Sequence, residues 1–302
     1  MATPSNHHSE HPSTYVVQDR SNEEELKRLQ IQDHLITTHM GGVLPEQPDP
    51  ARFQRVLDVG CGTGDWLIEA AKTYPTMKLL VGVDVSRTFV EYARIQAEAC
   101  RVDDRVEFQV MDALRMLEFP TGFFDLVNLR FGVSWLRTWD WPKLLQEFQR
   151  VARAGGVIRI SERGAVKSSS SAALLQIEQI AVRAFSQAGY FFAPHGDSVI
   201  DELVRLLNQH GLQQVQTRAY ALEFRGDSDE GQSFAEDYQH AYRTIAPFLQ
   251  KWTCVPDNYE DIYQEMVKEM HQPDCVTTWN LLTVWGTRPP GRETAHTLMR
   301  DR

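Results

Sequence analysis

The sequence predicts an α/β protein built on a doubly wound, mostly parallel sheet. Short apolar segments alternate with helical segments from residue 55 to residue 162, and a glycine-rich turn joins the first strand to the first helix. The apolar segments have the composition of strands covered on both faces, and strands separated by helices form right-handed crossovers. With 302 residues and 42% hydrophobic content, the chain can bury one large core and a smaller cap.

Each element follows from its local pattern. Residues 22–40 carry leucine and isoleucine at helical spacing and predict an N-terminal helix that ends at Gly41 and Gly42. In the alternating region we expect strands at 55–60, 79–84, 106–111, 124–129 and 157–162, and helices at 65–74, 87–100 and 141–153. Later we expect helices at 168–189 and 198–209, a strand at 213–224, helical segments between 227 and 271, and a last strand at 277–287.

The composition argues against several classes of protein. A formal net charge of -10 and a pI near 5.5 leave no concentrated basic surface for nucleic acid. No run approaches the ~20 apolar residues of a membrane span, so we expect a cytoplasmic protein without stable membrane insertion. The four cysteines lack paired metal-ligand spacing, which favours reduced thiols and no metal centre. We interpret His7, His8 and His11 as part of a solvated tail.

The stretch VLDVGCGTG forms a strand, a glycine turn and the start of a helix. Glycines at 60, 62 and 64 let a ligand approach the backbone, where helix N-terminal amides are exposed. A dinucleotide fold usually has the spacing G-x-G-x-x-G, and here it is G-x-G-x-G. Asp58 stands two positions before the first glycine, where it would repel a pyrophosphate and attract a cation. This pattern indicates a ligand that carries an ammonium group.

Two further carboxyl groups end the next two predicted strands. Asp84 follows the strand in VGVDVS and is placed to accept hydrogen bonds from both hydroxyls of a ribose. Asp112 follows the strand in VMDA and is placed to meet an adenine amino group. Together with the glycine turn, these positions indicate an adenosyl amino acid as the ligand.

These motifs resemble those of the class I S-adenosylmethionine-dependent methyltransferases, Rossmann-like, of the small-molecule, secondary-metabolism type. The resemblance is strong from about residue 54 to 162 and weaker from 212 to 289, and the motifs follow in the family's order: VLDVGCGTG, VGVDVS, VEFQVMDA, FFDLVNLRFG and LLQEFQRVARAGGVIRISE. It implies S-adenosyl-L-methionine as cofactor and a seven-stranded sheet whose last strand is antiparallel. The implied division is a disordered leader at 1–14, an N-terminal helical cover at 15–50, a cofactor-binding core at 51–162, a helical cap at 163–211, the rest of the sheet at 212–290 with a cap insertion at about 227–276, and a tail at 291–302.

The resemblance also assigns cofactor-binding positions. The methionine part would contact Gly60, Gly62, Gly64, Asp58, Asn128, Leu129 and Arg130, and the adenosine part would contact Asp84, Val85, Asp112 and Ala113. For Arg130 the alternatives are pairing with the cofactor carboxylate or an anionic substrate, and a structural salt bridge. In a subgroup of the family the N-terminal segment covers the cofactor, which would bring in Tyr15, Gln32 and His39. On their own, Gln32 and His39 fit better as polar positions on an amphipathic helix.

The implied reaction is an in-line displacement of a methyl group from a sulfonium. Such a reaction needs alignment and exclusion of water, and a general base only when the nucleophile must lose a proton. The candidate bases are Glu162, His195 and His39. The structural alternative for Glu162 is a carboxylate at a strand edge or paired with Arg163, and for His195 a loop histidine bonded to backbone.

Aromatic residues concentrate where a substrate would lie, after the carboxyl ends of the strands. We expect contacts to substrate from Trp135, Tyr190, Phe191 and Tyr242, although many aromatic side chains there must serve only for packing.

The predicted function is methyl transfer to a small hydrophobic or aromatic metabolite, of natural-product, lipid-like or quinone-like type. The main alternative is a protein that binds the cofactor without methyl transfer, as a regulator or cyclase. The glycine spacing argues against an NAD-dependent oxidoreductase and the charge against a nucleic-acid methyltransferase, and a homodimer is possible.

Overall fold

The computed structural model describes residues 14–17, 23–253 and 255–290. The tail at 291–302, the three N-terminal histidines and all but Thr14 of the expected leader lie outside the described residues. In the described part, no helix combines the length and apolarity needed to cross a bilayer. Cys61, Cys100 and Cys275 are free thiols, and Cys254 is outside the described range.

A single mixed sheet runs through the molecule in the order β3-β2-β1-β4-β5-β8, and both β6 and β7 pair with β8. The strands are β1 (Arg55–Val59), β2 (Leu79–Asp84), β3 (Val106–Val110), β4 (Phe124–Arg130), β5 (Ala152–Arg163), β6 (Ser168–Ser169), β7 (Gln213–Arg225) and β8 (Val276–Thr287). The first five are parallel, and β8 is antiparallel to both β5 and β7. This confirms the doubly wound α/β class with an antiparallel last strand, and the two-residue β6 adds one strand to the seven expected.

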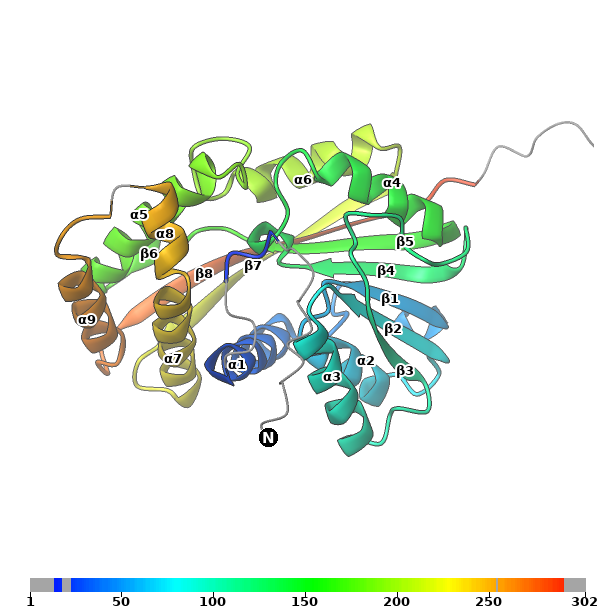
Figure 1. Cartoon of the computed structure of the whole chain (residues 1–302). Coiled ribbons are helices and arrows are strands. Elements are labelled where there is room, and N and C mark those ends of the chain that lie inside the picture. Colours follow the sequence, from blue (N-terminus) through cyan, green and yellow to red (C-terminus); the bar gives the residue numbers. More distant parts are fainter. Residues whose placement is uncertain (1–13, 18–22, 254, 291–302) are drawn as a thin grey trace, which may run out of the picture.

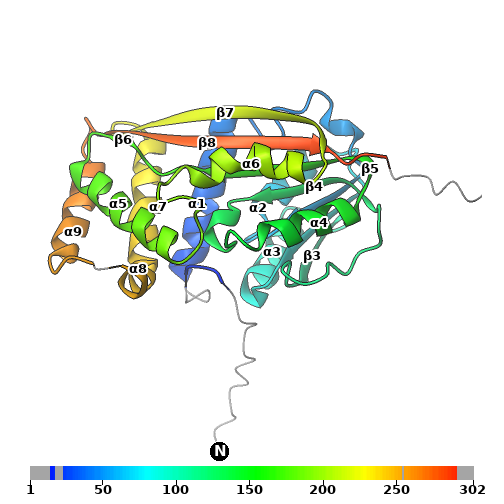
Figure 2. The same cartoon turned by 90° about the horizontal axis from the view of Figure 1, so that it is seen from above.

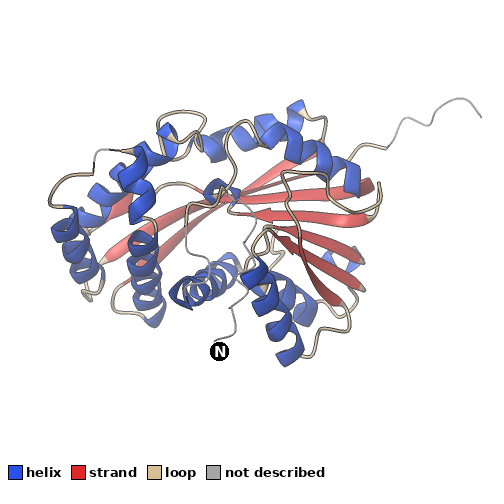
Figure 3. Ribbon diagram, in the orientation of Figure 1, coloured by secondary structure: helices blue, strands red, loops and turns tan. Residues whose placement is uncertain are grey.

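Helices cover both faces of this sheet (Figure 1 and Figure 3). The helices are α1 (Glu23–Met40), α2 (Asp65–Thr73), α3 (Arg87–Ala99), α4 (Trp141–Val151), α5 (Ala172–Gln187), α6 (Ser198–Gln209), α7 (Asp229–Thr244), α8 (Ala246–Trp252) and α9 (Tyr259–Met270). The side chains of β1 alternate between two cores, with Val56 packed on the α2–α3 side and Leu57 and Val59 on the α4–α6 side. This is the pattern of a central strand covered on both faces.

The strands β7 and β8 extend beyond the rest of the sheet and carry a helical cap of α5, α7, α8 and α9 (Figure 2). The cap has its own apolar core around Trp279, Phe234 and Leu174. Ile36 of α1 is fully buried in the same core. The N-terminal helix is therefore packed between the cofactor-binding part of the sheet and the cap.

Two element boundaries differ from the sequence prediction by more than two residues. The helix expected from residue 168 begins at Ala172, because Ser171 caps it by accepting a hydrogen bond from the Leu174 N–H, at 3.0 Å. The strand expected at 157 begins five residues earlier, after a register shift between Phe124 and Leu126 in its pairing with β4.

Candidate active site

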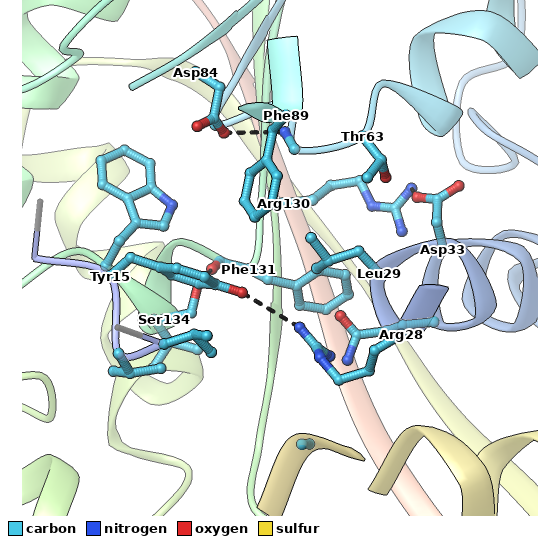
Figure 4. A pocket seen from close by; sticks show the side chains of 18 of the residues that line it. Tyr15, Arg28, Leu29, Asp33, Thr63, Asp84, Phe89, Arg130, Phe131 and Ser134 are labelled. Carbon is cyan, nitrogen blue, oxygen red and sulfur yellow. Dashed lines mark hydrogen bonds and ion pairs between the residues drawn. The ribbon is translucent and has the colours of Figure 1, made fainter. Parts of the chain in front are cut away.

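One cavity of about 260 Å³ lies at the carboxyl ends of β1, β2 and β4. Its walls come from the glycine turn, α1, the loop after β4, and the cap helices α5 and α7. In open α/β sheets, ligands bind at this edge, where the strand order reverses. The side chains that line it come from segments far apart in the sequence, as Figure 4 shows for Tyr15, Asp33, Asp84 and Arg130.

The glycine turn is held in a conformation that favours glycine. Gly60, Gly62 and Gly64 have φ angles of 70°, 53° and 81°, all in the left-handed region. Gly60 and Gly62 line the cavity. Gly64 does not, and a Cβ there would lie 2.5 Å from the ring of Phe108. The first two glycines therefore open the backbone to a ligand, whereas the third lets α2 pack closely on β3.

Asp84 is locked in place at the end of β2. One carboxylate oxygen accepts a hydrogen bond from the Gly62 N–H at 3.1 Å, and the other accepts from the Ser86 N–H at 2.8 Å. Asp84 thus couples the glycine turn to the position expected for the ribose, and the adjacent Val85 also lines the cavity.

At the end of β3, Asp112 and Ala113 line the same wall. The Asp112 carboxylate accepts a hydrogen bond from the Leu114 N–H at 3.0 Å and lies 3.3 Å from the Arg115 guanidinium. The residues expected to meet the ribose and the adenine are therefore brought together along one side of the cavity, in the order of their strands. This arrangement fits an adenosyl group.

Asp58 belongs to a buried polar chain beneath the cavity. Its carboxylate accepts from the Asn128 amide at 2.7 Å, Asn128 accepts from Arg159 at 2.8 Å, and Arg159 pairs with Glu46 at 2.8 Å. Burial raises the pKa of Asp58 to about 7, although the Asn128 hydrogen bond and the charge of Arg130 act against it. Asn128 itself does not line the cavity, and it acts on the site by orienting Asp58.

Arg130 forms the structural salt bridge that the sequence left open as an alternative. Its guanidinium lies 2.8 Å from the Asp33 carboxylate and donates a hydrogen bond to Thr37 at 3.3 Å, so it connects the end of β4 to α1 (Figure 4). The side chain also lines the cavity. Leu129 is fully buried and lies outside the lining.

An N-terminal cover, formed by residues 14–17 and α1, closes one side of the cavity. The Val16 N–H donates to the Ser134 carbonyl at 3.0 Å, and the Tyr15 hydroxyl donates to Glu25 at 2.7 Å. Arg28 then pairs with Glu25 at 2.8 Å and with Asp237 of α7 at 3.2 Å. Tyr15 and Arg28 point toward one another in Figure 4. The cover is therefore attached to the cap by buried charges.

Two predicted residues of α1, Gln32 and His39, and Trp66 of α2 have defined partners. Gln32 lines the cavity and donates to Asp237 at 3.4 Å. Trp66 also lines it, with its indole N–H donating to the Val43 carbonyl at 3.1 Å. His39 does not line it: its Nδ1 lies 2.9 Å from the Leu35 carbonyl oxygen, and its ring packs on Phe224.

The other two candidate bases also lie outside the cavity lining. Glu162 is fully buried behind the loop after β4, where its carboxylate accepts from the Val133 N–H at 3.3 Å, and burial raises its pKa to about 8. His195 lies on the surface, 3.8 Å from Asp201, with 53% of its side chain exposed. The placement of Glu162 favours its structural alternative of a carboxylate at a strand edge, whereas the neighbour of the His195 ring is the Asp201 carboxylate and not the backbone.

The four predicted substrate contacts divide into two pairs. Trp135 and Tyr242 line the cavity, and a Cβ placed on Gly60 would lie 3.1 Å from the Trp135 ring. Tyr190 and Phe191 lie outside the lining and pack on Phe185, with ring centroids 5.5 Å away in both cases.

Sequence reasoning missed several cavity residues, namely Arg28, Asp33, Arg163, Glu178, Asp237, Tyr238 and Trp279. One usable signal was the alternation of side chains along β5, which places consecutive residues on opposite faces. Because Glu162 is turned away from the cavity, its neighbour Arg163 lies on the cavity side. Nothing comparable identifies the residues of the cap helices, whose contact with the cavity depends on tertiary packing. In the part of the chain that the structure describes, no cluster of acidic, histidine and cysteine side chains is arranged to hold a metal.

Comparisons with known proteins agree with this geometry. Residues 56–156 match the family model described as a methyltransferase domain. A ubiquinone/menaquinone biosynthesis C-methyltransferase from Geobacter sp. (strain M21) is 34% identical over 108 residues, which cover 36% of this chain and 45% of that protein. The 27-O-demethylrifamycin SV methyltransferase of Amycolatopsis mediterranei (strain S699) is 31% identical over 127 residues, 42% of this chain and 43% of that protein. The chain thus spans less than half the length of these curated relatives.

Among solved structures, the YcgJ protein of Bacillus subtilis has a similar fold, with a TM-score of 0.50 at 20% identity over 79% of this chain and 93% of that chain. The family match covers the glycine turn and the acidic ends of β2 and β3. The strand order and the antiparallel β8 complete the pattern expected from the sequence. Residues 56–156 are therefore similar to a methyltransferase domain, and the strand order of the sheet agrees with that similarity.

Proposed function

We propose that this protein transfers the methyl group of S-adenosyl-L-methionine to a small metabolite of largely apolar or aromatic character. The observation that carries the proposal is the continuity of the cavity, which runs from the glycine turn to an aromatic wall in the cap. That wall includes Phe131, Phe185 and Trp279. Flat apolar side chains with a few polar groups among them suit a ring-containing metabolite.

The residues along the sheet edge would hold the cofactor. We assign the ribose hydroxyls to Asp84 and the adenine to Val85, Asp112 and Ala113. The cofactor's ammonium group is assigned to the neighbourhood of Asp58, because a nearby cation favours the charged form of a carboxylate whose pKa burial has raised to about 7. Bound in this way, the cofactor supplies an electrophilic methyl group.

The remaining contribution of the chain is alignment and exclusion of water. The N-terminal cover and α7 close the cavity through Arg28, which pairs with buried carboxylates on both sides. Closure favours a displacement reaction, because it fixes the two reactants and keeps water from competing with the acceptor. The enclosed shape and the net charge of -10 favour a small molecule over nucleic acid as substrate. A homodimer and a cytoplasmic location stay predictions.

The proposal is tested by binding and transfer measured on the same protein. Calorimetry with S-adenosylhomocysteine should detect binding, and incubation with methyl-labelled S-adenosylmethionine and a panel of phenols, quinols and polyketides should label at least one compound. Asp84→Ala should weaken binding about 100-fold, since two hydrogen bonds to a charged group contribute about 3 kcal/mol together. Asp201→Ala, at a carboxylate with 61% of its side chain exposed, is the matched control.

Unchanged affinity in the Asp84→Ala variant would show that the ribose assignment is wrong. Tight binding of the cofactor without labelled product from any compound would favour a protein that binds the cofactor without methyl transfer. Circular dichroism of the variant is needed as well, because Asp84 also holds the Gly62 and Ser86 amides.

A further inference from the structure

The cap end of the cavity contains a polar group of side chains that cofactor binding leaves without a role. We call Arg163, Glu178, Tyr238 and Tyr242 the cap polar cluster. Arg163 is the last residue of β5, Glu178 belongs to α5, and both tyrosines belong to α7. All four line the cavity, on the side formed by the cap.

Arg163 lies closer to the cap than Asn128, Leu129 and Arg130, the residues of β4 that were expected to contact the cofactor. In the register of β4 and β5, Arg130 is opposite Ser161, so Arg163 lies two residues, or roughly 7 Å, beyond it. Among the described residues, its guanidinium makes no hydrogen bond or close ion pair: it lies 5.8 Å from the centre of the Trp279 ring and interacts at longer range with the charges of Glu178 and Asp237. A guanidinium offers five N–H donors, so this group presents unused donors to the cavity.

The acceptor of the cluster is Glu178, whose side chain is buried. It accepts a hydrogen bond from the Tyr242 hydroxyl at 2.7 Å, and burial raises its pKa although the charge of Arg163 acts against this. The Tyr238 hydroxyl, on a side chain that is 4% exposed, lies beside Glu178 but makes no hydrogen bond of normal geometry within the described ranges. Burial and the charge of Glu178 raise the pKa of Tyr238. A buried hydroxyl without a well-formed hydrogen bond is costly.

The charges of the cluster restrict what can bind there. A ligand carboxylate would be repelled by Glu178, and a ligand ammonium group would be repelled by Arg163. Asp237, the other carboxylate on this wall, is already paired with Arg28. A hydroxyl group can donate to the carboxylate and accept from the guanidinium or from Tyr238, so it satisfies both kinds of partner.

We propose that a phenolic hydroxyl of the methyl acceptor binds between Arg163 and Glu178 of the cap polar cluster. This inference rests on the proposed function and specifies its substrate class. The ring of such a compound would lie near the rings of Phe131 and Trp279, which line the cavity and stack with centroids 6.3 Å apart. Arg163 and Glu178 act here as specificity-determining residues, because they discriminate a free hydroxyl from a methylated or ionised group.

Three naphthalene probes of similar size test the proposal: 2-naphthol, 2-methoxynaphthalene and 2-naphthoate. Their binding is measured by calorimetry, both with the protein alone and with the protein saturated with S-adenosylhomocysteine. We expect 2-naphthol to bind at least tenfold more tightly than either other probe. Arg163→Met should remove this preference while S-adenosylhomocysteine affinity stays within twofold. Arg243→Met, on α7 of the cap and with 54% of its side chain exposed, is the matched control and should keep the preference.

Tyr238→Phe removes one oxygen and should lower 2-naphthol affinity about threefold, which keeps the test available if Arg163→Met does not fold. Any one of four results would overturn the proposal. They are a wild-type preference for 2-naphthol below threefold, tighter binding of 2-naphthoate, no binding of any probe, and a preference retained in Arg163→Met. A protein that binds no S-adenosylhomocysteine but still prefers 2-naphthol would instead contradict the proposed function, so the two failures are distinguishable.

Discussion

Replacing Arg28 with methionine should loosen the attachment of the N-terminal cover to the cap. The guanidinium makes two 2.8 Å hydrogen bonds to Glu25 and a third contact to Asp237 at 3.2 Å. Both carboxylates are buried, with 0% and 1% of their side chains exposed. The substitution keeps most of the apolar volume and leaves two buried carboxylates without their counter-charge.

Breaking a buried ion pair from one side costs about 3–5 kcal/mol. An unfolding entropy of about 2.1 cal/mol/K per residue over 302 residues corresponds to about 0.6 kcal/mol/K. The expected fall in Tm is therefore about 5–8 °C. Arg87→Met is the matched control, because Arg87 pairs with Glu91 at 3.7 Å with both side chains more than half exposed. An exposed pair of this kind contributes about 0.5 kcal/mol, so the control should shift Tm by less than about 1 °C.

Differential scanning calorimetry of the wild type, Arg28→Met, Asp237→Asn and the double variant measures the effect. If the pair carries the stabilisation, Arg28→Met should cost about 1–3 kcal/mol less when Asp237 is already neutral. A Tm for Arg28→Met within about 1 °C of the wild type, like that of Arg87→Met, would refute the reasoning.

Three further predictions test residues near the cavity. Burial raises the pKa of Glu162 to about 8 in the folded state, against an ordinary value of 4.5. Its contribution to the free energy of unfolding is therefore full below about pH 4.5 and is lost as the pH rises through 8. Urea unfolding should show that Glu162→Gln lacks this decline, and parallel pH profiles of the two proteins would contradict the prediction. Gly64→Ala should lower the free energy of unfolding by about 2–5 kcal/mol, because the φ of Gly64 is 81° and the new Cβ would lie 2.5 Å from Phe108. Gly211→Ala is the control: with a φ of 77° and open space around the new Cβ, it should lower the free energy by about 1–2 kcal/mol. Equal urea midpoints for the two variants would show that the ring contact is tolerated. His195→Ala should change the free energy of unfolding by less than about 0.5 kcal/mol and leave methyl transfer unchanged, since 53% of the side chain is exposed. A tenfold loss of turnover would instead indicate that His195 is the general base.

Most of the fold was predictable because its signals are local. The apolar runs of β1 to β4, the glycine turn and the helix-capping residues each act within a few positions, and the strands lie close to where periodicity placed them. The gathering of Asp84 and Asp112 at one wall of the cavity was predictable for the same reason: they end successive strands, and parallel strands bring their carboxyl ends to one edge. Their contact with a cofactor stays a prediction.

The orientation of individual side chains was harder to predict from the sequence. Glu162 and Arg163 are neighbours at the end of β5, and from the sequence either residue could face the cavity. The structure buries Glu162 behind Val133 and leaves Arg163 in the cavity wall. A shift of one position exchanges the faces of a strand, so the choice depends on pairing with β4 and β8.

The sequence by itself determined the sheet, its glycine turn and the acidic residues at the strand ends, because strand periodicity, left-handed glycines and strand-end carboxylates are encoded within short segments. Only the tertiary structure decided how the cavity is closed and what its far wall contains. Arg28 meets Asp237 across 209 positions of the chain, and Glu178 meets Tyr242 across 64. Such contacts arise from packing α1, α5 and α7 around β8, and no local pattern specifies the partner of a polar residue on a helix.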